Sequence, residues 1–292
     1  MKPIALFTDA AADIPSELFR SIDATIIPMV YSVGDSMYVH APSPAQMPLR
    51  AYYTILKNGA FGSTSAISTE RYIEYFEQAL LSGRDALYIG LSSHLSSSFD
   101  YAQVAAQELS QKYRDNKVVC IDSLSASAGQ TLLLLLARDL HEQGQGIDQI
   151  AAALIDARPY AGVWVSVEDI AYLQRGGRVG KTTAALSVAL GIRPLLHIDD
   201  AGRIVLGGAG TVRGKKRCAQ TLVNRLIATH KPSLGNTVFV LHTGDESLSI
   251  ELAELVADQV PYCDLHIAEV GPIIGTHLGY GAMAVLFWAS ER

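Results

Sequence analysis

The sequence lacks the features that mark several large classes of protein. Only three cysteines occur among the 292 residues, Cys120, Cys218 and Cys263. Their scattered positions give neither a disulfide framework nor the spacing of a metal site. Acidic residues outnumber basic ones by 29 to 23, and the densest basic cluster, residues 213–217, is short. The resulting net charge of −6 predicts that the protein binds no nucleic acid.

Long apolar runs are also missing. The two longest, residues 131–137 and 282–289, fall far short of the roughly 20 residues that a membrane helix needs. Asp9 interrupts the first apolar stretch too early for the core of a secretory signal. At 49% hydrophobic and 18% charged residues, the composition is that of a folded chain with a large core. We therefore expect a cytoplasmic globular protein.

Short apolar runs alternate with helical patterns in the first half of the chain. Apolar side chains recur at helical spacing in residues 69–81 and 97–113. Strands alternating with amphipathic helices predict parallel βαβ units, and hence a doubly wound α/β sheet. The strands are predicted at residues 4–9, 24–33, 86–92 and 117–123.

A second unit follows, with a predicted boundary that gives an N-terminal domain of residues 1–158 and a C-terminal domain of residues 159–292. Residues 264–288 are predicted to form a strand, a glycine-rich turn and an apolar helix or strand. The other predicted elements of this domain are strands at 161–169, 203–212 and 236–244 and a helix at 246–260.

The loops that should follow the N-terminal strands are rich in serine and threonine. In a doubly wound sheet such loops lie at one edge, which is where ligands bind. Hydroxyl groups and the free N–H groups of helix N-termini suit a carboxylate or a phosphate. These loops are residues 8–15, 62–69, 91–98 and 121–129.

Individual hydroxyls in these loops have different predicted roles. Ser97 and Asp100 have the spacing of a capping box, so Ser97 is predicted to cap a helix. Ser96 and Thr64 are not needed for capping on this interpretation, so their hydroxyls are candidates for ligand binding. The alternative, that every serine here caps a helix or completes a turn, stays open.

Two stretches come close to the G-x-S-x-G motif of serine hydrolases. In residues 90–94 His94 replaces the second glycine, and in residues 125–129 a serine replaces the first. An esterase or thioesterase built on Ser96 or Ser92 with His277 is therefore an alternative function.

Two further glycine-rich stretches present single cationic or polar side chains. Residues 175–182 approach a Walker A loop, but Arg175 stands where that motif needs glycine. They predict an exposed turn that presents Arg178, although an ordinary helix end with a surface arginine fits equally well locally. His277 lies among four glycines in residues 271–281, and from a predicted loop it could donate a hydrogen bond to a carboxylate.

Taken together, these segments resemble the DegV family, the fatty-acid-binding proteins that serve bacterial fatty acid kinase. The match departs from the family pattern at Ala10, Ala66, Ile67 and Tyr280. The segments that carry the resemblance, in the family's order, are FTDAAADIP (7–15), STSAIS (63–68), GLSSHLSSSFDYA (90–102), VEDIAYLQRGGRVGK (167–181), GIRPLLHIDDAGRI (191–204) and GPIIGTHLGYGAMAV (271–285).

The resemblance implies a two-domain α/β fold, with a parallel N-terminal sheet, a mixed C-terminal sheet and one long-chain fatty acid buried between the domains. It implies that Thr64, Ser96 and His277 hold the carboxylate. Arg178, and more loosely Arg213, would serve docking and phosphoryl transfer by an ATP-dependent fatty acid kinase that feeds phospholipid synthesis.

On this reading the chain is a carrier without a cofactor or catalysis of its own. It would touch the membrane surface at most transiently, to exchange lipid. A carrier or sensor for another amphiphilic acid, such as a retinoid-like or isoprenoid acid, is a further alternative.

Overall fold

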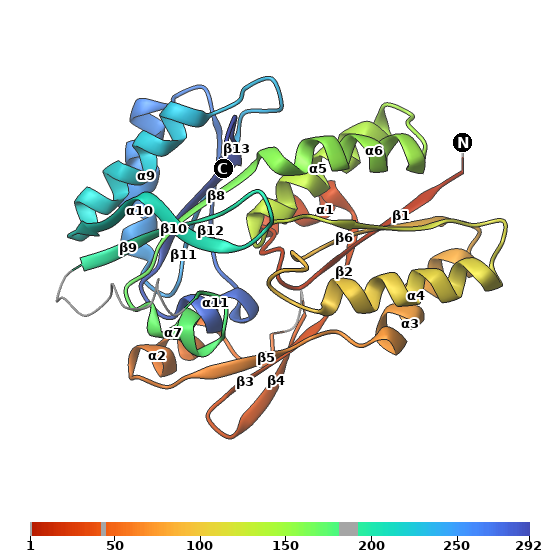
Figure 1. The fold of residues 1–292 in the computed structure, drawn as a ribbon, viewed down its shortest axis with the longest axis horizontal. Helices are drawn as coiled ribbons and strands as arrows, with labels where there is room; N and C mark the ends of the chain where they lie inside the picture. Colours follow the sequence, from red (N-terminus) through yellow and green to blue (C-terminus); the bar gives the residue numbers. More distant parts are fainter. Residues whose placement is uncertain (1, 42–44, 181–191) are drawn as a thin grey trace.

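A computed structural model describes residues 2–41, 45–180 and 192–292 (Figure 1). Its first sheet has four parallel strands in the order β2-β1-β6-β7, which confirms the predicted parallel sheet of the first half. Every position of β6 is buried, as expected of a central strand covered on both faces. The strands are β1 (Ile4–Asp9), β2 (Ala24–Ile27), β6 (Asp85–Gly90) and β7 (Val118–Asp122).

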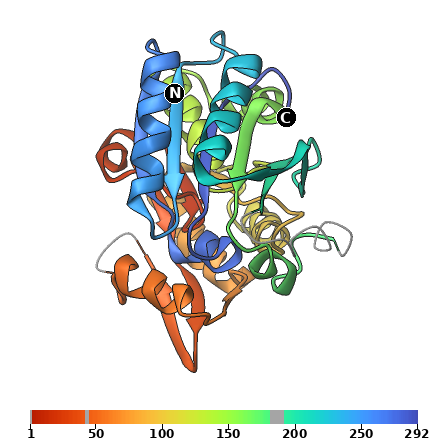
Figure 2. The same ribbon diagram turned by 90° about the vertical axis from the view of Figure 1, so that its left-hand side faces the viewer.

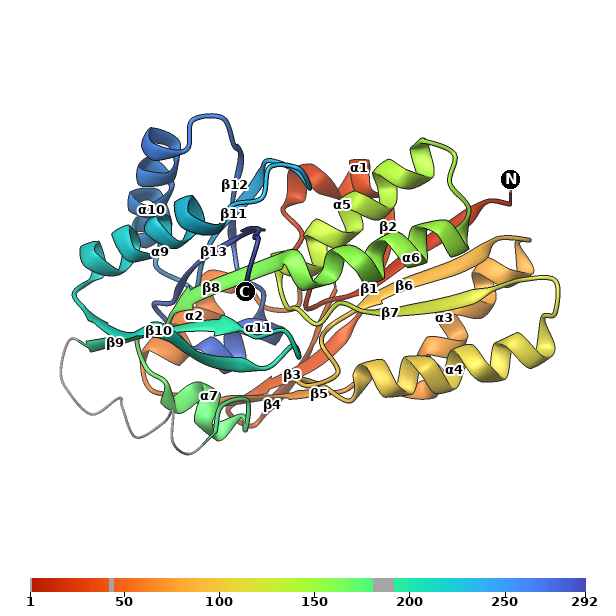
Figure 3. The same ribbon diagram turned by 45° about the horizontal axis from the view of Figure 1, so that its top comes forward.

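Helices cover both faces of this sheet. Helices α3 and α4 pack on one face and α5 and α6 on the other, as Figure 3 shows. Helix α3 buries Tyr72, Phe76, Ala79 and Leu80, the face that its apolar spacing predicts. The helices of this part are η1 (Ser16–Leu18), α1 (Phe19–Ile22), α3 (Thr69–Leu81), α4 (Ser98–Lys112), α5 (Ala128–Glu142), α6 (Ile147–Ala157) and η2 (Arg158–Tyr160).

The single strand predicted at residues 24–33 is two strands in two sheets. Pro28 separates them, because proline has no N–H to donate to a sheet. The second strand, β3 (Met29–Val33), joins an antiparallel sheet with β4 (Ser36–His40) and β5 (Gly62–Ser65), in the order β4-β3-β5. Helix α2 (Leu49–Lys57) lies between β4 and β5 in the chain.

The second large sheet is mixed and has six strands in the order β10-β9-β8-β13-β11-β12. Only β11 and β12 pair in parallel. The apolar segment that closes the chain, predicted as a helix or a strand, is strand β13. The strands are β8 (Ala161–Ser166), β9 (Ile192–Ile198), β10 (Ile204–Arg213), β11 (Thr237–His242), β12 (Asp264–Glu269) and β13 (Met283–Trp288).

The mixed sheet separates two cores. Helices α9 (Lys215–Thr229) and α10 (Glu246–Gln259) cover one face, at the opposite end of the molecule from the three-stranded sheet (Figure 2). Along β8, Trp164 belongs to the core under these helices, whereas Val163 and Val165 belong to the larger core. That larger core contains residues on both sides of residues 158 and 159. The domain boundary predicted there stays a prediction. Helix α5 contacts both large sheets.

Two short helices pack against each other. Helix α7 (Ala171–Arg175) ends at Gly176, in agreement with the alternative that a helix end precedes Arg178. The predicted glycine-rich turn is instead helix α11 (Pro272–Leu278), which begins with a proline at its first position and ends at Gly279, where φ is +72°. No helix of the described residues is long and apolar enough to cross a membrane.

Candidate functional site

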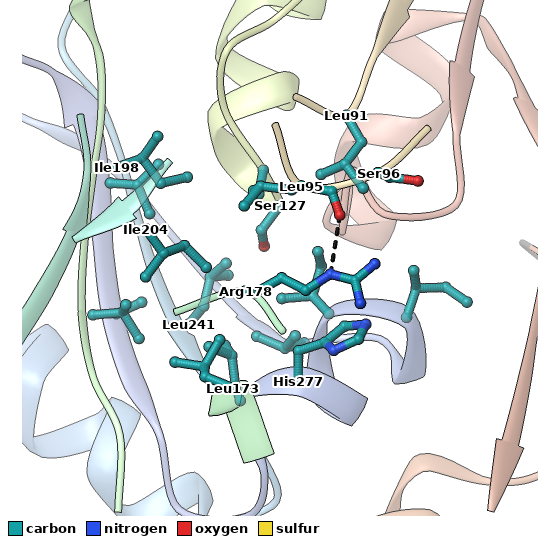
Figure 4. Close-up of a pocket in the computed structure, with 18 of the residues that line it drawn as sticks. Leu91, Leu95, Ser96, Ser127, Leu173, Arg178, Ile198, Ile204, Leu241 and His277 are labelled. Carbon is teal, nitrogen blue, oxygen red and sulfur yellow. Dashed lines mark hydrogen bonds between the residues drawn. The ribbon is translucent and has the colours of Figure 1, made fainter. Parts of the chain in front are cut away.

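A largely apolar cavity lies against the face of the mixed sheet that carries Val163, Val165 and Leu286, and residues of β3, β5 and α11 also line it. About 800 Å³ of space, its open mouth included, is free of protein atoms there. In Figure 4, Ile198, Ile204 and Leu241 lie on one side of it, and Ser96 and His277 on the other. The polar side chains among its lining residues are Thr64, Ser96, Ser127, Arg178, His197 and His277.

The side chains of Thr64 and His277 meet at this cavity. Thr64 Oγ1 lies 2.9 Å from Nε2 of His277. Burial and, to a smaller extent, the nearby charge of Arg178 lower the pKa of His277 to about 4, so the imidazole is neutral at pH 7. A neutral imidazole and a hydroxyl carry two hydrogens between them, and their mutual bond uses only one. When the imidazole hydrogen is on Nε2, the Thr64 hydroxyl keeps its own hydrogen for a ligand; when it is on Nδ1, the spare N–H faces Gly176.

Helix α11 owes its position to a pair of buried tyrosines on α2. The Tyr53 hydroxyl donates to the carbonyl of Val270 at 2.6 Å, and the Tyr52 hydroxyl lies 2.7 Å from Oγ1 of Thr276. These bonds fix the beginning and the middle of the segment that carries His277. The imidazole lies against Gly176, where a β-carbon would come within 2.4 Å of Nδ1.

Thr64 reaches the cavity from an unexpected element. The sequence places it on a loop between a parallel strand and a helix, whereas it lies on β5 of the antiparallel sheet, opposite Tyr31. The prediction failed because the chain leaves the parallel sheet at Pro28. The strand that follows, β3, pairs with residues 62–65 instead.

The serine turn differs from the capping box that its sequence predicts. Ser97 has helical dihedral angles, and its side chain makes no capping hydrogen bond, so that prediction is wrong. Ser96 takes the role instead, because its Oγ accepts from the N–H of Ser98 at 3.2 Å. Ser98 Oγ in turn lies 3.0 Å from Ser96 Oγ and accepts from the N–H of Ile67 at 3.1 Å. Ser96 thus both shapes the turn and lines the cavity.

The two predicted arginines lie in different places. Arg178 lines the cavity, and its Nε donates to the carbonyl of Leu95 at 3.0 Å. Arg213 instead lines a separate depression, together with Arg217 and Thr221. Of the Walker-like stretch, residues 181 and 182 lie outside the described residues.

Ser127, which lines the cavity, and Asp13, which accepts from it, were not predicted from the sequence. Ser127 lines the cavity just before α5 with φ +54° and ψ −140°, a strained conformation for a residue with a side chain. Its hydroxyl donates to the carboxylate of Asp13, which also accepts from the N–H of Gly271 at 2.8 Å. Burial raises the pKa of Asp13 to about 7.

The arrangement gives little support to a serine hydrolase. The Ser92 hydroxyl donates to the carbonyl of Gly202 at 2.8 Å, and Nε2 of His277 faces Thr64. Among the described residues, no hydrogen bond joins His277 to Ser92 or Ser96, as a catalytic pair requires. The described part of the chain also holds no group of three or more metal-ligating side chains.

Comparison with known proteins decides the family. The model of the DegV family of uncharacterised proteins matches residues 3–290. The chain belongs to the DegV family. A DegV domain-containing protein of Clostridium perfringens is 30% identical over 292 residues, which cover 100% of this chain and 99% of that protein.

Solved structures have the same fold. A DegV family protein from Thermus thermophilus, described as fatty acid binding, is 26% identical and superposes with a TM-score of 0.85 over 99% of this chain and 100% of the other. The fatty acid kinase B3 protein of Streptococcus pneumoniae, loaded with linoleic acid, has a TM-score of 0.83 at 20% identity, over 98% and 99% of the two chains. The ligands of such neighbouring structures are fatty acids.

Proposed function

We propose that the chain binds one long-chain fatty acid in the cavity and carries it without transforming it. The observation that supports this most directly is the lining of the site, a largely apolar cavity whose polar side chains include Thr64, Ser96 and His277. The fatty acid bound by a relative of the same fold supports the choice of ligand.

The chemistry of the lining suits such a molecule. An acyl chain of about sixteen carbons, at about 0.8 kcal/mol per buried CH₂, contributes on the order of 10 kcal/mol before ordering costs. A buried carboxylate needs hydrogen-bond donors, which the Thr64–His277 pair and the Ser96 hydroxyl would supply. Affinity would thus come from the chain, and orientation from the head group.

Native mass spectrometry of the purified protein tests the proposal. We expect co-purified fatty acid, and we expect the delipidated protein to bind palmitate again. Thr64→Val keeps the shape of the side chain but removes its hydroxyl, so it should weaken binding by about tenfold. Ser65→Val, at an exposed neighbouring position, is the matched control. A wild-type protein without affinity for any fatty acid would contradict the proposal.

The partner in this proposal is an ATP-dependent kinase that phosphorylates the bound carboxylate. Arg178 supports it, because its guanidinium lines the cavity beside His277. We expect Arg178→Gln to retain fatty acid and to lose acyl-phosphate formation in the presence of a fatty acid kinase and ATP. Arg213→Gln tests in the same assay whether Arg213 also serves the kinase. Turnover of an acyl ester, lost in Ser96→Ala, would favour the esterase instead.

A further inference from the structure

Two serines at the cavity wall are joined by a pair of hydrogen bonds. Ser96 lines the cavity, and Ser98 is the first residue of helix α4. Ser96 Oγ accepts from the N–H of Ser98 at 3.2 Å and lies 3.0 Å from Ser98 Oγ. Ser98 Oγ also accepts from the N–H of Ile67 at 3.1 Å. The direction of the bond between the two hydroxyls therefore decides what Ser96 offers to a ligand.

The burial of Ser98 decides this direction. Its hydroxyl has one hydrogen, and its hydrogen-bond partners among the described residues are the N–H of Ile67, which is itself a donor, and Ser96 Oγ. Because Ser98 is 0% exposed, solvent water cannot accept this hydrogen. If Ser96 were the donor, the hydrogen of Ser98 would be buried without an acceptor, which is unfavourable. Ser98 therefore donates to Ser96.

Ser96 then has no lone pair left for a ligand. A hydroxyl oxygen has two lone pairs, and those of Ser96 are both used by Ser98, one by its N–H and one by its O–H. The hydrogen of Ser96 has no acceptor among the residues that the structure describes. Because Ser96 lines the cavity, this hydrogen is available to a ligand. Ser96 can thus donate to a head group but cannot accept from one.

The pair of Thr64 and His277 supplies a second donor. Nδ1 of His277 is buried without a hydrogen-bond partner among the described residues, and it faces Gly176. A hydrogen on Nδ1 would be crowded by Gly176 and unpaired, which favours the form with the hydrogen on Nε2. The Nε2–H group then donates to Thr64 Oγ1, and the hydroxyl of Thr64 keeps its own hydrogen for a ligand.

We propose that Ser98 is a positioning residue that restricts Ser96 to donating, so that the site selects a ligand whose head group only accepts hydrogen bonds. The inference rests on the proposed function. The two oxygens of an ionised carboxylate can accept from Ser96 and from Thr64. A primary amide has nearly the same shape, but when its oxygen faces Thr64, its NH₂ group faces the hydrogen of Ser96. The site therefore binds the acid and rejects the amide of the same chain length.

Dodecanoate and dodecanamide, which differ only in the head group, test the proposal. Competition against a fluorescent fatty acid on the delipidated protein gives the Kd of each. The wild-type protein should prefer dodecanoate by at least about a hundredfold. Ser98→Ala leaves Ser96 a free lone pair that can accept from the amide, so the preference should fall by about tenfold, chiefly because dodecanamide binds more tightly. Ser98→Thr retains the hydroxyl and should retain the preference.

A double variant separates positioning from a purely structural role of Ser98. If Ser98 acts through Ser96, Ser98→Ala should leave the preference unchanged in a protein that already carries Ser96→Ala. An equal loss of affinity for both ligands, repeated in the Ser96→Ala background, would overturn the proposal. Ser97→Ala, at an exposed neighbouring serine without a capping bond, is the matched control and should keep the wild-type preference.

Infrared spectra of the wild-type protein give a test that needs no variant, should Ser98→Ala fail to fold. Bound dodecanoate labelled with ¹³C at its carboxyl should show the bands of an ionised carboxylate at about pH 7. A labelled protonated-carboxyl band would overturn the proposal, because an acid O–H needs an acceptor that Ser96 does not offer. Equal wild-type affinity for dodecanoate and dodecanamide would also overturn it and leave the proposed function standing. Absence of any fatty acid binding by the wild-type protein would overturn both.

Discussion

The Thr64 hydroxyl lies 2.9 Å from Nε2 of His277, although 213 residues separate the two in the chain. Thr64 comes from β5 of the three-stranded sheet, and His277 comes from helix α11, which precedes β13 in the chain. The contact therefore depends on how these two distant elements pack. Changes that shift either element by a fraction of an ångström should alter binding before they alter folding.

Gly176→Ala should displace His277. The backbone of Gly176 has φ −69°, which alanine tolerates, but the new β-carbon would lie 2.4 Å from Nδ1 of the imidazole. We expect fatty acid affinity to fall by at least about tenfold, or about 1.4 kcal/mol, with little change in stability. Gly177→Ala is the matched control, since nothing lies within 4 Å and its φ of +72° costs only stability. Equal affinities of the two variants would contradict this account.

Tyr53→Phe should destabilise the fold. The substitution removes the hydrogen bond to the Val270 carbonyl and leaves that buried acceptor unpaired. The expected cost is about 1–3 kcal/mol in the free energy of unfolding, measured by chemical denaturation. Tyr101→Phe, at a position 42% exposed, should change stability much less.

The parallel sheet could be predicted because its strands are short apolar runs separated by amphipathic helices. The antiparallel sheet could not, because Pro28 interrupts what reads as one apolar segment, and nothing local says that residues 29–33 pair with residues 62–65. Helix α11 was missed for a similar reason, since glycine-rich sequences usually form turns. There, tyrosines from α2 impose the helix through tertiary hydrogen bonds.

Among the site residues, those carried by the family motifs could be named from the sequence. Thr64, Ser96, Arg178 and His277 all line the cavity, whereas Arg213 does not. Ser127 and Asp13 were missed because their bond joins residues 114 positions apart. Ser96 accepts the hydrogen bond that was predicted for Ser97, because a capping box and a turn one residue earlier have almost the same sequence pattern.

Asp13→Asn should change how stability depends on pH. Burial raises the pKa of Asp13 from 3.8 to about 7 in the folded protein. A raised pKa means that its contribution to stability is full below the unfolded value and is lost as the pH rises through about 7. Asparagine stays neutral, so the variant does not lose this contribution as the pH rises. The free energy of unfolding of the variant minus that of the wild-type protein should therefore increase by a few kcal/mol between about pH 4 and 8. Denaturation curves across this range measure the difference, and a flat difference would contradict the buried charge.

Ile204→Phe should shift the preference for acyl chain length. Ile204 lines the cavity on the side away from Ser96 and His277 (Figure 4), so a larger side chain there shortens the space left for the end of an acyl chain. Each CH₂ that is no longer buried costs about 0.8 kcal/mol. We therefore expect the affinity for stearate to fall by more than tenfold while that for dodecanoate changes little, in competition binding monitored by native mass spectrometry. Leu81→Phe, at a helix end 70% exposed, should leave both affinities unchanged. A uniform loss across chain lengths would instead indicate that the substitution distorts the head-group site.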